Sequence, residues 1–329
     1  MHQLVRPVVA AAVLGLVASG TTIVAVAAPS DAPRQRIGAR SPRPRVIPKA
    51  GAVPVRPRAV PTSSASPIAA PPPAASSSAA SFPAAASTGA KGRLTPYSAA
   101  KVISTDGAVI DAKLVTGQLT VNADNVTVRN TRITSTSTYG ILVWGKNFTL
   151  VDSTLDGITG QASIAGFSDQ GGGDIHLTRV DASGSPDLVR MGADGSTVAD
   201  SYFHDVCGPA TCSGAHNDTV GVLPGTRSVK ITHNTILNAE SQTAAVEIGD
   251  TRSAQSSGEL RNNLIAGGGY SVYAMGASHG LGWTVDGNAF STRYYARGGY
   301  WGPVNSWSAG TGNVWTSNRW LETGQPVSP

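Results

Sequence analysis

The amino-acid sequence predicts an all-β domain, a parallel β-helix, behind a polar N-terminal region. Three observations predict it. Short alternating apolar segments recur along the C-terminal two thirds of the chain, a six-residue motif returns every 21 to 33 residues, and that region has no run with the apolar spacing of an amphipathic helix. Stacked coils bury their inward side chains only against neighbouring coils, so such a motif must recur many times.

The first 27 residues have the composition of a secretory signal peptide. One arginine precedes a long apolar run, and Ala-Val-Ala stands before Ala28, as at a cleavage site. The alternative is an uncleaved membrane anchor, because the apolar run is long enough to span a bilayer, about 20 residues. We therefore expect the rest of the chain to be secreted, or tethered at the cell surface if the segment is not cleaved.

Residues 28–93 are rich in Pro, Ala, Ser and Arg and contain few large apolar side chains, so we expect a disordered linker. The linker has ten Lys or Arg and one Asp, whereas residues 94–329 have fourteen Lys or Arg and nineteen Asp or Glu. The basic character of the whole chain therefore comes from the linker, which suits contact with an anionic cell wall or surface. The mildly acidic domain gives no reason to expect a nucleic acid partner, and we expect a monomer.

Residues 94–329 are predicted to form the β-helix, with about eight coils. Most copies of the repeated motif have an apolar residue, two residues that are often polar, then Asn, Ser or Thr, any residue, and a large apolar residue, and the copy from Leu177 fits least well. Its copies are VRNTRI from Val128, LVDSTL from Leu150, LTRVDA from Leu177, VADSYF from Val198, ITHNTI from Ile231, LRNNLI from Leu260, VDGNAF from Val285 and WTSNRW from Trp315. We expect the Asn, Ser or Thr at a corner, where its side chain can bond nearby backbone.

A second alternating segment lies between copies of the motif. These segments are GILVWG, DLVRMG, DTVGVL, AAVEIG and SVYAMG. An antiparallel sandwich is the alternative fold, but it would need hairpin turns at intervals of about 8–12 residues. Few such turns are present, so the pattern favours stacked coils.

Several of these segments resemble the coils of right-handed parallel β-helix proteins of the pectate-lyase-like superfamily, above all NVTVRNTRI, NFTLVDSTLDG and SVKITHNTILN. The resemblance covers about residues 102–321 and implies a single right-handed parallel β-helix that acts on or binds carbohydrate. The superfamily includes polysaccharide lyases, glycoside hydrolases, epimerases, phage tail proteins and adhesins. The Trp-Ile-Asp-His stretch and the Arg-x-Pro-x-x-Arg loop of pectate lyases are absent, so no pectate lyase catalytic residue is carried over.

The second segments align on their valines, because equivalent positions of successive coils lie about 4.8 Å apart. The alignment predicts two inward columns, formed by Val189, Val220 and Val246 and by Met191, Val222 and Ile248. It also predicts one outward column, formed by Arg190, Gly221 and Glu247. The bare Gly221 between two charged residues would let a ligand lie against the sheet.

Ionisable residues are densest around this column. Asp187 and Asp218 would begin adjacent strands, and His216 lies two residues before Asp218. The candidate catalytic residues, which combine carboxylates, a cation and an imidazole, are His216, Asp218, Arg190, Glu247 and Asp187. Asn217, between the histidine and the aspartate, is a candidate substrate-binding residue.

Two reactions fit these residue types. In β-elimination, which we place first, Arg190 or a metal at Asp187 and Asp218 would neutralise a uronate carboxylate, and His216 would remove the neighbouring proton. In glycoside hydrolysis, two carboxylates would flank the scissile bond, at about 5 Å for retention of configuration or about 6.5–9.5 Å for inversion. Calcium would suit carboxylate ligands, although the sequence has no EF-hand spacing.

Each of these residues also has a purely structural interpretation. Asp187 and Asp218 can make Asx turns at strand starts, Arg190 and Glu247 can form an exposed ion pair between coils, and His216 can be an exposed loop residue. A non-catalytic, adhesive or wall-associated β-helix that binds glycans is therefore the third functional alternative.

The aromatic C-terminal region contains two further candidates for substrate binding, Tyr300 and Trp301, whose rings could stack on sugar faces. The alternative is that these rings cover the open end of the coil stack. Cys207 and Cys212 are the only cysteines, and in an oxidising compartment we expect them to form a disulfide. A zinc site would need more Cys or His ligands.

Overall fold

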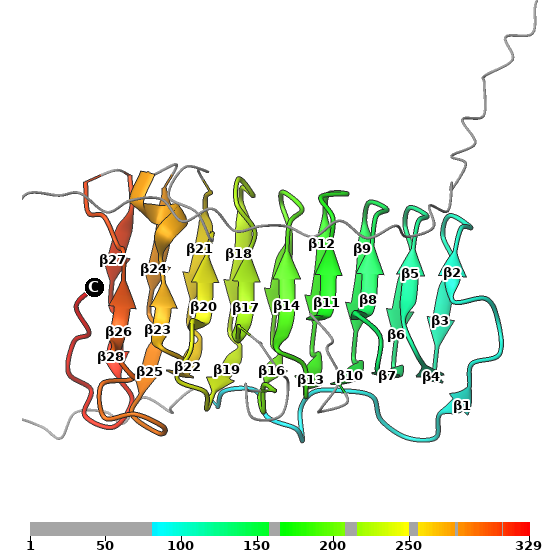
Figure 1. The fold of residues 1–329 in the computed structure, drawn as a ribbon, viewed down its shortest axis with the longest axis horizontal. Coiled ribbons are helices and arrows are strands. Elements are labelled where there is room, and N and C mark those ends of the chain that lie inside the picture. The colour runs from blue at the N-terminus through cyan, green and yellow to red at the C-terminus, as the bar shows by residue number, and fades with distance from the viewer. Residues whose placement is uncertain (1–80, 158–164, 208–215, 250–255, 280–281, 311) are drawn as a thin grey trace, which may run out of the picture. The chain divides into compact units, whose positions relative to one another are not determined.

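The computed structural model describes residues 81–157, 165–207, 216–249, 256–279, 282–310 and 312–329, all within the unit Ala74–Pro329. This part of the chain is a right-handed parallel β-helix built of three long parallel sheets, which confirms the predicted fold class (Figure 1). Each coil contributes one strand to sheet B, then one to sheet C, then one to sheet A. Among the described residues, no helix is long and apolar enough to cross a membrane.

The strands of each sheet follow one another in chain order. Sheet A contains β1 (Thr95–Pro96), β4 (Lys113–Thr116), β7 (Arg132–Ser135), β10 (Thr154–Gly157), β13 (Asp181–Ser183), β16 (Tyr202–Phe203), β19 (Thr235–Asn238), β22 (Leu264–Gly267), β25 (Ala289–Ser291) and β28 (Arg319–Trp320). Sheet B contains β2 (Val102–Ile103), β5 (Leu119–Val121), β8 (Tyr139–Val143), β11 (Ala165–Asp169), β14 (Asp187–Met191), β17 (Asp218–Val222), β20 (Ala244–Ile248), β23 (Tyr270–Tyr273) and β26 (Gly302–Asn305). Sheet C contains β3 (Val109–Asp111), β6 (Thr127–Arg129), β9 (Phe148–Val151), β12 (Ile175–Thr178), β15 (Thr197–Ala199), β18 (Val229–Thr232), β21 (Gly258–Arg261), β24 (Trp283–Asp286) and β27 (Val314–Thr316). A short 3-10 helix, η1 (Met275–His279), follows β23.

The repeated sequence motif forms the corner between sheet C and sheet A. Its third residue has a left-handed backbone in every copy, with φ from 43° at Asn130 to 66° at Gly287. In the four last copies its fourth residue is a buried asparagine, and these side chains bond to one another along the stack. Asn263, for example, donates from its backbone N and from Nδ2 to Oδ1 of Asn288, each at 2.9 Å.

Sheets B and C have nine strands each, so the structure has one coil more than the eight copies of the motif. The additional coil is the first, β2, β3 and β4. Its corner has the same left-handed backbone at Ala112, with φ of 54°. Lys113 stands where most copies of the motif have Asn, Ser or Thr, so this coil departs from the sequence pattern.

The hydrophobic core fills the space between the three sheets. Alternate residues of each strand point inward, so equivalent apolar side chains stack from coil to coil. Phe148 and Phe167, for instance, are fully buried with ring centroids 5.9 Å apart. Burial along the whole stack gives each coil its stability through its two neighbours.

Residues 81–93, which we call the strap, run along the coils from later coils towards earlier ones, as the cyan chain in Figure 1 shows. This direction is opposite to the order in which the coils follow one another in the sequence. The carbonyl of Pro83 accepts a hydrogen bond of 2.6 Å from Thr235 Oγ1. Further along, Ala90 N donates to Thr154 Oγ1 at 3.0 Å, and Lys91 N donates to Asn130 Oδ1 at 2.7 Å. The sequence assigned these residues to the linker, but the structure bonds them to several coils of the domain.

Candidate functional site

The predicted catalytic residues all line one pocket of about 400 Å³ on the outer face of sheet B. The pocket spans the strands β14, β17, β20 and β23. Its lining residues are Asp187, Arg190, His216, Asp218, Gly221, Val222, Leu223, Thr243, Glu247, Tyr273 and Met275. The coil stack thus brings together side chains that are up to 88 residues apart in sequence, from Asp187 to Met275.

The register between the strands agrees with the register predicted from sequence. Val189 pairs with Val220 and Val220 with Val246, and all three are fully buried. One residue later, Gly221 pairs with Arg190 on one side and with Glu247 on the other. The outward column of charged residues around a bare glycine is therefore present.

Asp187 and Asp218 begin adjacent strands and bond to the backbone of the next strand. Asp187 Oδ1 accepts the backbone N–H of Asp218 at 3.0 Å, and Asp218 Oδ1 accepts the backbone N–H of Ala244 at 3.0 Å. These bonds join adjacent coils, unlike the local Asx turns that the structural interpretation of the sequence suggested. Because each bond fixes one carboxyl oxygen, the orientation of both side chains in the pocket is also fixed.

Burial favours the protonated form of both carboxyl groups. The pKa of Asp187 is raised to about 7, chiefly by burial and then by the charge of Asp218. The pKa of Asp218 is raised well above its ordinary value by burial, by the charge of Glu247 and by a hydrogen bond with that side chain. A hydrogen bond between two carboxyl groups needs a proton on one of them, so Asp218 and Glu247 share a proton.

Arg190 and His216 provide the basic groups of the pocket. Arg190 lies on the same strand as Asp187, with Nη1 3.6 Å from Asp187 Oδ2. Its charge favours the ionised form of Asp187 but does not outweigh burial. His216 is exposed, so its imidazole stands at the solvent side of the pocket.

Thr243 is a member of the pocket that the sequence interpretation missed. Its side chain donates a hydrogen bond that lowers the pKa of Asp218, and its Oγ1 accepts the backbone N–H of Asn217 at 3.0 Å. Its φ is 42°, an unfavourable backbone for a β-branched residue, and such strain is common at functional sites. Since Asp218 pairs with Ala244, a register argument places Thr243 next to Asn217 and could have found it.

Tyr273 was also missed, although it extends the outward column. It pairs with Glu247 on β20 and lines the pocket. The alternating segment SVYAMG contains it at the position equivalent to Arg190 and Glu247. Carrying the alignment one strand further would have identified it.

Gly221 forms part of the pocket wall without a side chain. A Cβ atom built at this position would lie 3.9 Å from both Asp218 Cβ and Val189 O, which is ordinary van der Waals contact. Glycine is therefore not needed here to avoid a clash. Its effect is to leave the space between Arg190 and Glu247 open to a ligand.

The structure does not bring the predicted substrate-binding residues into this pocket. Asn217 is fully buried and its Nδ2 donates to the carbonyl of Cys207, so its side chain cannot contact a substrate. Tyr300 and Trp301 are exposed, but Trp301 lines a different cavity, described below. Cys207 is buried, and its expected disulfide partner Cys212 lies outside the described residues, so this pairing stays a prediction.

The carboxylates do not form a recognisable metal centre. Within the described residues, no group of three or more His, Cys, Asp or Glu side chains is arranged to hold a metal ion. One oxygen of Asp187 and one of Asp218 already accept backbone N–H groups. The donor set therefore does not provide the roughly six to eight oxygen ligands that calcium takes.

The pocket therefore combines a proton shared between two carboxyl groups, a third carboxyl group that titrates near neutral pH, and a guanidinium. Such an arrangement can donate a proton to one atom of a substrate while a carboxylate acts on a neighbouring atom. Comparisons with protein-family models, with curated proteins and with solved structures found no match to this chain.

Proposed function

We propose that this protein hydrolyses glycosidic bonds in an extracellular polysaccharide, with the pocket on sheet B as its active site. The observation that carries the proposal is the set of carboxyl groups Asp187, Asp218 and Glu247 in one pocket, with pKa values raised in two of them. Glycosidases use one carboxylic acid as proton donor and a second carboxylate as nucleophile or base. The resemblance of the coils to the pectate-lyase-like superfamily supports a carbohydrate substrate.

Asp218 is the proposed general acid. It is nearly fully buried and shares a proton with Glu247, so it can donate a proton to the glycosidic oxygen at neutral pH. Proton donation lets the bond between this oxygen and the anomeric carbon break, and the leaving sugar departs as an alcohol. This donation leaves both Asp218 and Glu247 ionised, and the pair regains its shared proton when Asp218 deprotonates water in the second step.

Asp187 is the proposed nucleophile. Adjacent strands lie about 4.8 Å apart, close to the separation of about 5–5.5 Å in retaining glycosidases. In its ionised form, which Arg190 favours, Asp187 would attack the anomeric carbon and form a glycosyl ester. Water, deprotonated by Asp218, would then hydrolyse the ester and restore both groups, with retention of configuration.

β-Elimination is the second candidate, and one specific observation favours it. Arg190 and the exposed His216 line the same pocket, so a guanidinium could bind a uronate carboxylate while an imidazole removes the proton. We place it second because the buried groups of the pocket are carboxyl groups, which would repel a substrate carboxylate when ionised. Glycan binding without catalysis remains the third candidate.

The test uses the purified protein and a panel of neutral and uronate polysaccharides. We expect new reducing ends, retained anomeric configuration by NMR, and no ultraviolet absorbance from unsaturated products. Asp218→Asn keeps an acceptor for Ala244 N–H and should fold, yet lower the rate about 10²–10⁴-fold. Gly221→Leu should also inactivate by filling the pocket, whereas Asp111→Asn, on the exposed ion pair with Arg129, should leave the rate unchanged.

Three results would count against hydrolysis. Unsaturated products would assign the pocket to β-elimination. Full activity of Asp218→Asn would remove the proposed acid. Polysaccharide binding without any cleavage would make the protein a binding module, and we would then expect Gly221→Leu to abolish that binding.

The N-terminal region supports an extracellular setting for this activity. We propose that residues 1–27 direct export and that the basic residues 28–80 contact an anionic cell wall. Both segments lie outside the described residues. Under the same oxidising conditions we propose the Cys207–Cys212 disulfide, which would close a short loop just before His216.

A further inference from the structure

A second cavity of about 500 Å³ lies at the C-terminal end of the coil stack. It is formed by the loop before β26, by the start of β26, and by residues around β28. Its lining residues are Thr292, Ala296, Arg297, Trp301, Gly302, Pro303, Trp320, Glu322 and Thr323. None of them lines the carboxylate pocket, so this is a separate concave surface.

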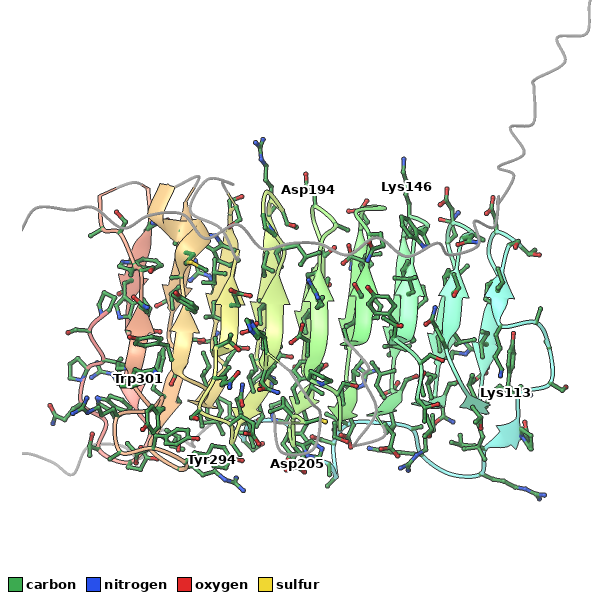
Figure 2. All side chains as sticks on the ribbon, viewed as in Figure 1. Lys113, Lys146, Asp194, Asp205, Tyr294 and Trp301 are labelled. Carbon is green, nitrogen blue, oxygen red and sulfur yellow. The ribbon has the colours of Figure 1, made fainter. Side chains whose placement is uncertain are left out.

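Trp301 gives this cavity an exposed aromatic wall, and Figure 2 labels it beside the last coils. Its side chain is 60% exposed, whereas Trp283 is fully buried. The Tyr300 ring stands edge-on to the Trp301 ring at 4.7 Å between centroids, and the backbone N–H of Trp301 donates to Gly269 O at 2.8 Å. The indole is thus held in place without being covered, so a ligand that stacks on it loses little side-chain entropy.

Two charged groups lie in the same cavity. Glu322 Oε1 accepts hydrogen bonds from Ser291 Oγ at 2.6 Å and from Thr292 N at 2.9 Å. Burial alone would raise the pKa of Glu322, but these bonds outweigh it and lower the pKa, so the group stays ionised. Arg297 is exposed and has no hydrogen-bond or ion-pair partner within the described part of the chain.

A flat apolar ring beside an anion and a guanidinium matches the chemistry of a sugar unit. The C–H face of a pyranose stacks on tryptophan, while hydroxyl groups donate to a carboxylate and accept from a guanidinium. An aliphatic ligand would leave Glu322 and Arg297 desolvated without partners, which is unfavourable. We propose that this cavity is an accessory binding site for a sugar unit of a polysaccharide.

The position of the cavity links it to the carboxylate pocket. Gly302 pairs with Tyr270, and Asn305 pairs with Tyr273, which lines the pocket. β26 is therefore two strands from Glu247 on β20, or about 10 Å along sheet B. In this proposal the accessory site would hold the polymer while the neighbouring pocket acts on it. That the bound polymer is also the substrate of the pocket rests on the proposed function.

Binding is tested in the full-length Asp218→Asn protein, in which we expect cleavage to be about 10²–10⁴-fold slower, with oligogalacturonate and cellohexaose as probes. Titration by calorimetry should show that Trp301→Ala weakens binding of at least one probe about tenfold, the loss of roughly 1.4 kcal/mol. Arg297→Ala should weaken the uronate probe more than the neutral one. Trp144→Ala is the matched control, because Trp144 is also exposed, at 55%, but lies on the early coils after β8.

The outcomes separate this inference from the proposed function. Binding that depends on Trp301 in a protein that cleaves no polysaccharide supports the accessory site and contradicts hydrolysis. Cleavage of polysaccharide with unchanged binding by Trp301→Ala overturns the accessory site alone. Equal losses in Trp301→Ala and Trp144→Ala, or no measurable binding of either probe, also overturn it.

Discussion

Replacing Asp187 with Asn should make the folded protein more stable at alkaline pH. The folded state raises the pKa of Asp187 from 3.8 to about 7, whereas the unfolded chain leaves it at its ordinary value. Between these two values the folded state holds a proton that the unfolded state has released, so stability falls as pH rises. The stabilisation is fully present below the unfolded pKa and is lost as pH rises through about 7.

The magnitude follows from the size of the pKa change. A shift of about three units at roughly 1.4 kcal/mol per unit gives about 4 kcal/mol of stability lost by about pH 8. The Asp187 side chain is only 13% exposed, so solvent screening reduces this value little. An Asn at this position stays neutral and still offers an oxygen to Asp218 N–H, so it should remove the loss.

The assay is urea unfolding of the full chain at about pH 4, 6 and 8, followed by tryptophan fluorescence. Wild type and Asp187→Asn should be similar near pH 4, and the variant should gain up to about 4 kcal/mol near pH 8. Asp111→Asn, whose carboxyl group is 45% exposed in the ion pair with Arg129, is the control. Parallel stability profiles for wild type and Asp187→Asn would refute the idea that Asp187 carries the buried proton.

The remaining predictions concern the coil stack. Asn263→Ala should lower the free energy of unfolding by about 3 kcal/mol or more, measured by urea unfolding, because Asn263 Oδ1 accepts from both N and Nδ2 of Asn234 in the buried ladder. A loss under about 1 kcal/mol would mean that water replaces these bonds. Gly145→Ala should reduce folded yield and melting temperature sharply, because its Cβ would lie 1.9 Å from Ala123 O. Gly310→Ala, with φ of 84° and nothing within 4 Å, should cost only about 1–2 kcal/mol, and equal effects of the two changes would contradict the clash.

Much of the fold could be predicted because a β-helix repeats one local rule. The alternation of side chains and the corner motif fix which residues of a coil point inward, and stacking then fixes their neighbours. Val189, Val220 and Val246 were therefore placed correctly, and the column of Arg190 and Glu247 followed from them.

Other features depend on packing that leaves little trace in sequence. The burial of Asn217 depends on the loop that carries it, and alternation within the strand does not determine it. Trp301 and Glu322 meet because the chain after β28 returns to the last coil. The composition of residues 81–93 resembles that of the preceding linker, so nothing in it indicated that the strap binds the coils.

The strap also sets an order of events during synthesis. Within the stack, each hydrogen-bonded coil lies a few tens of residues from the next, but Thr235 Oγ1 bonds to Pro83 O across 152 residues. The strap leaves the ribosome before the coils do, yet its partner Thr235 is made only after more than half of the domain has been translated. We therefore expect coils to form progressively on the growing chain. The strap would dock late and add its hydrogen bonds to coils that have already formed.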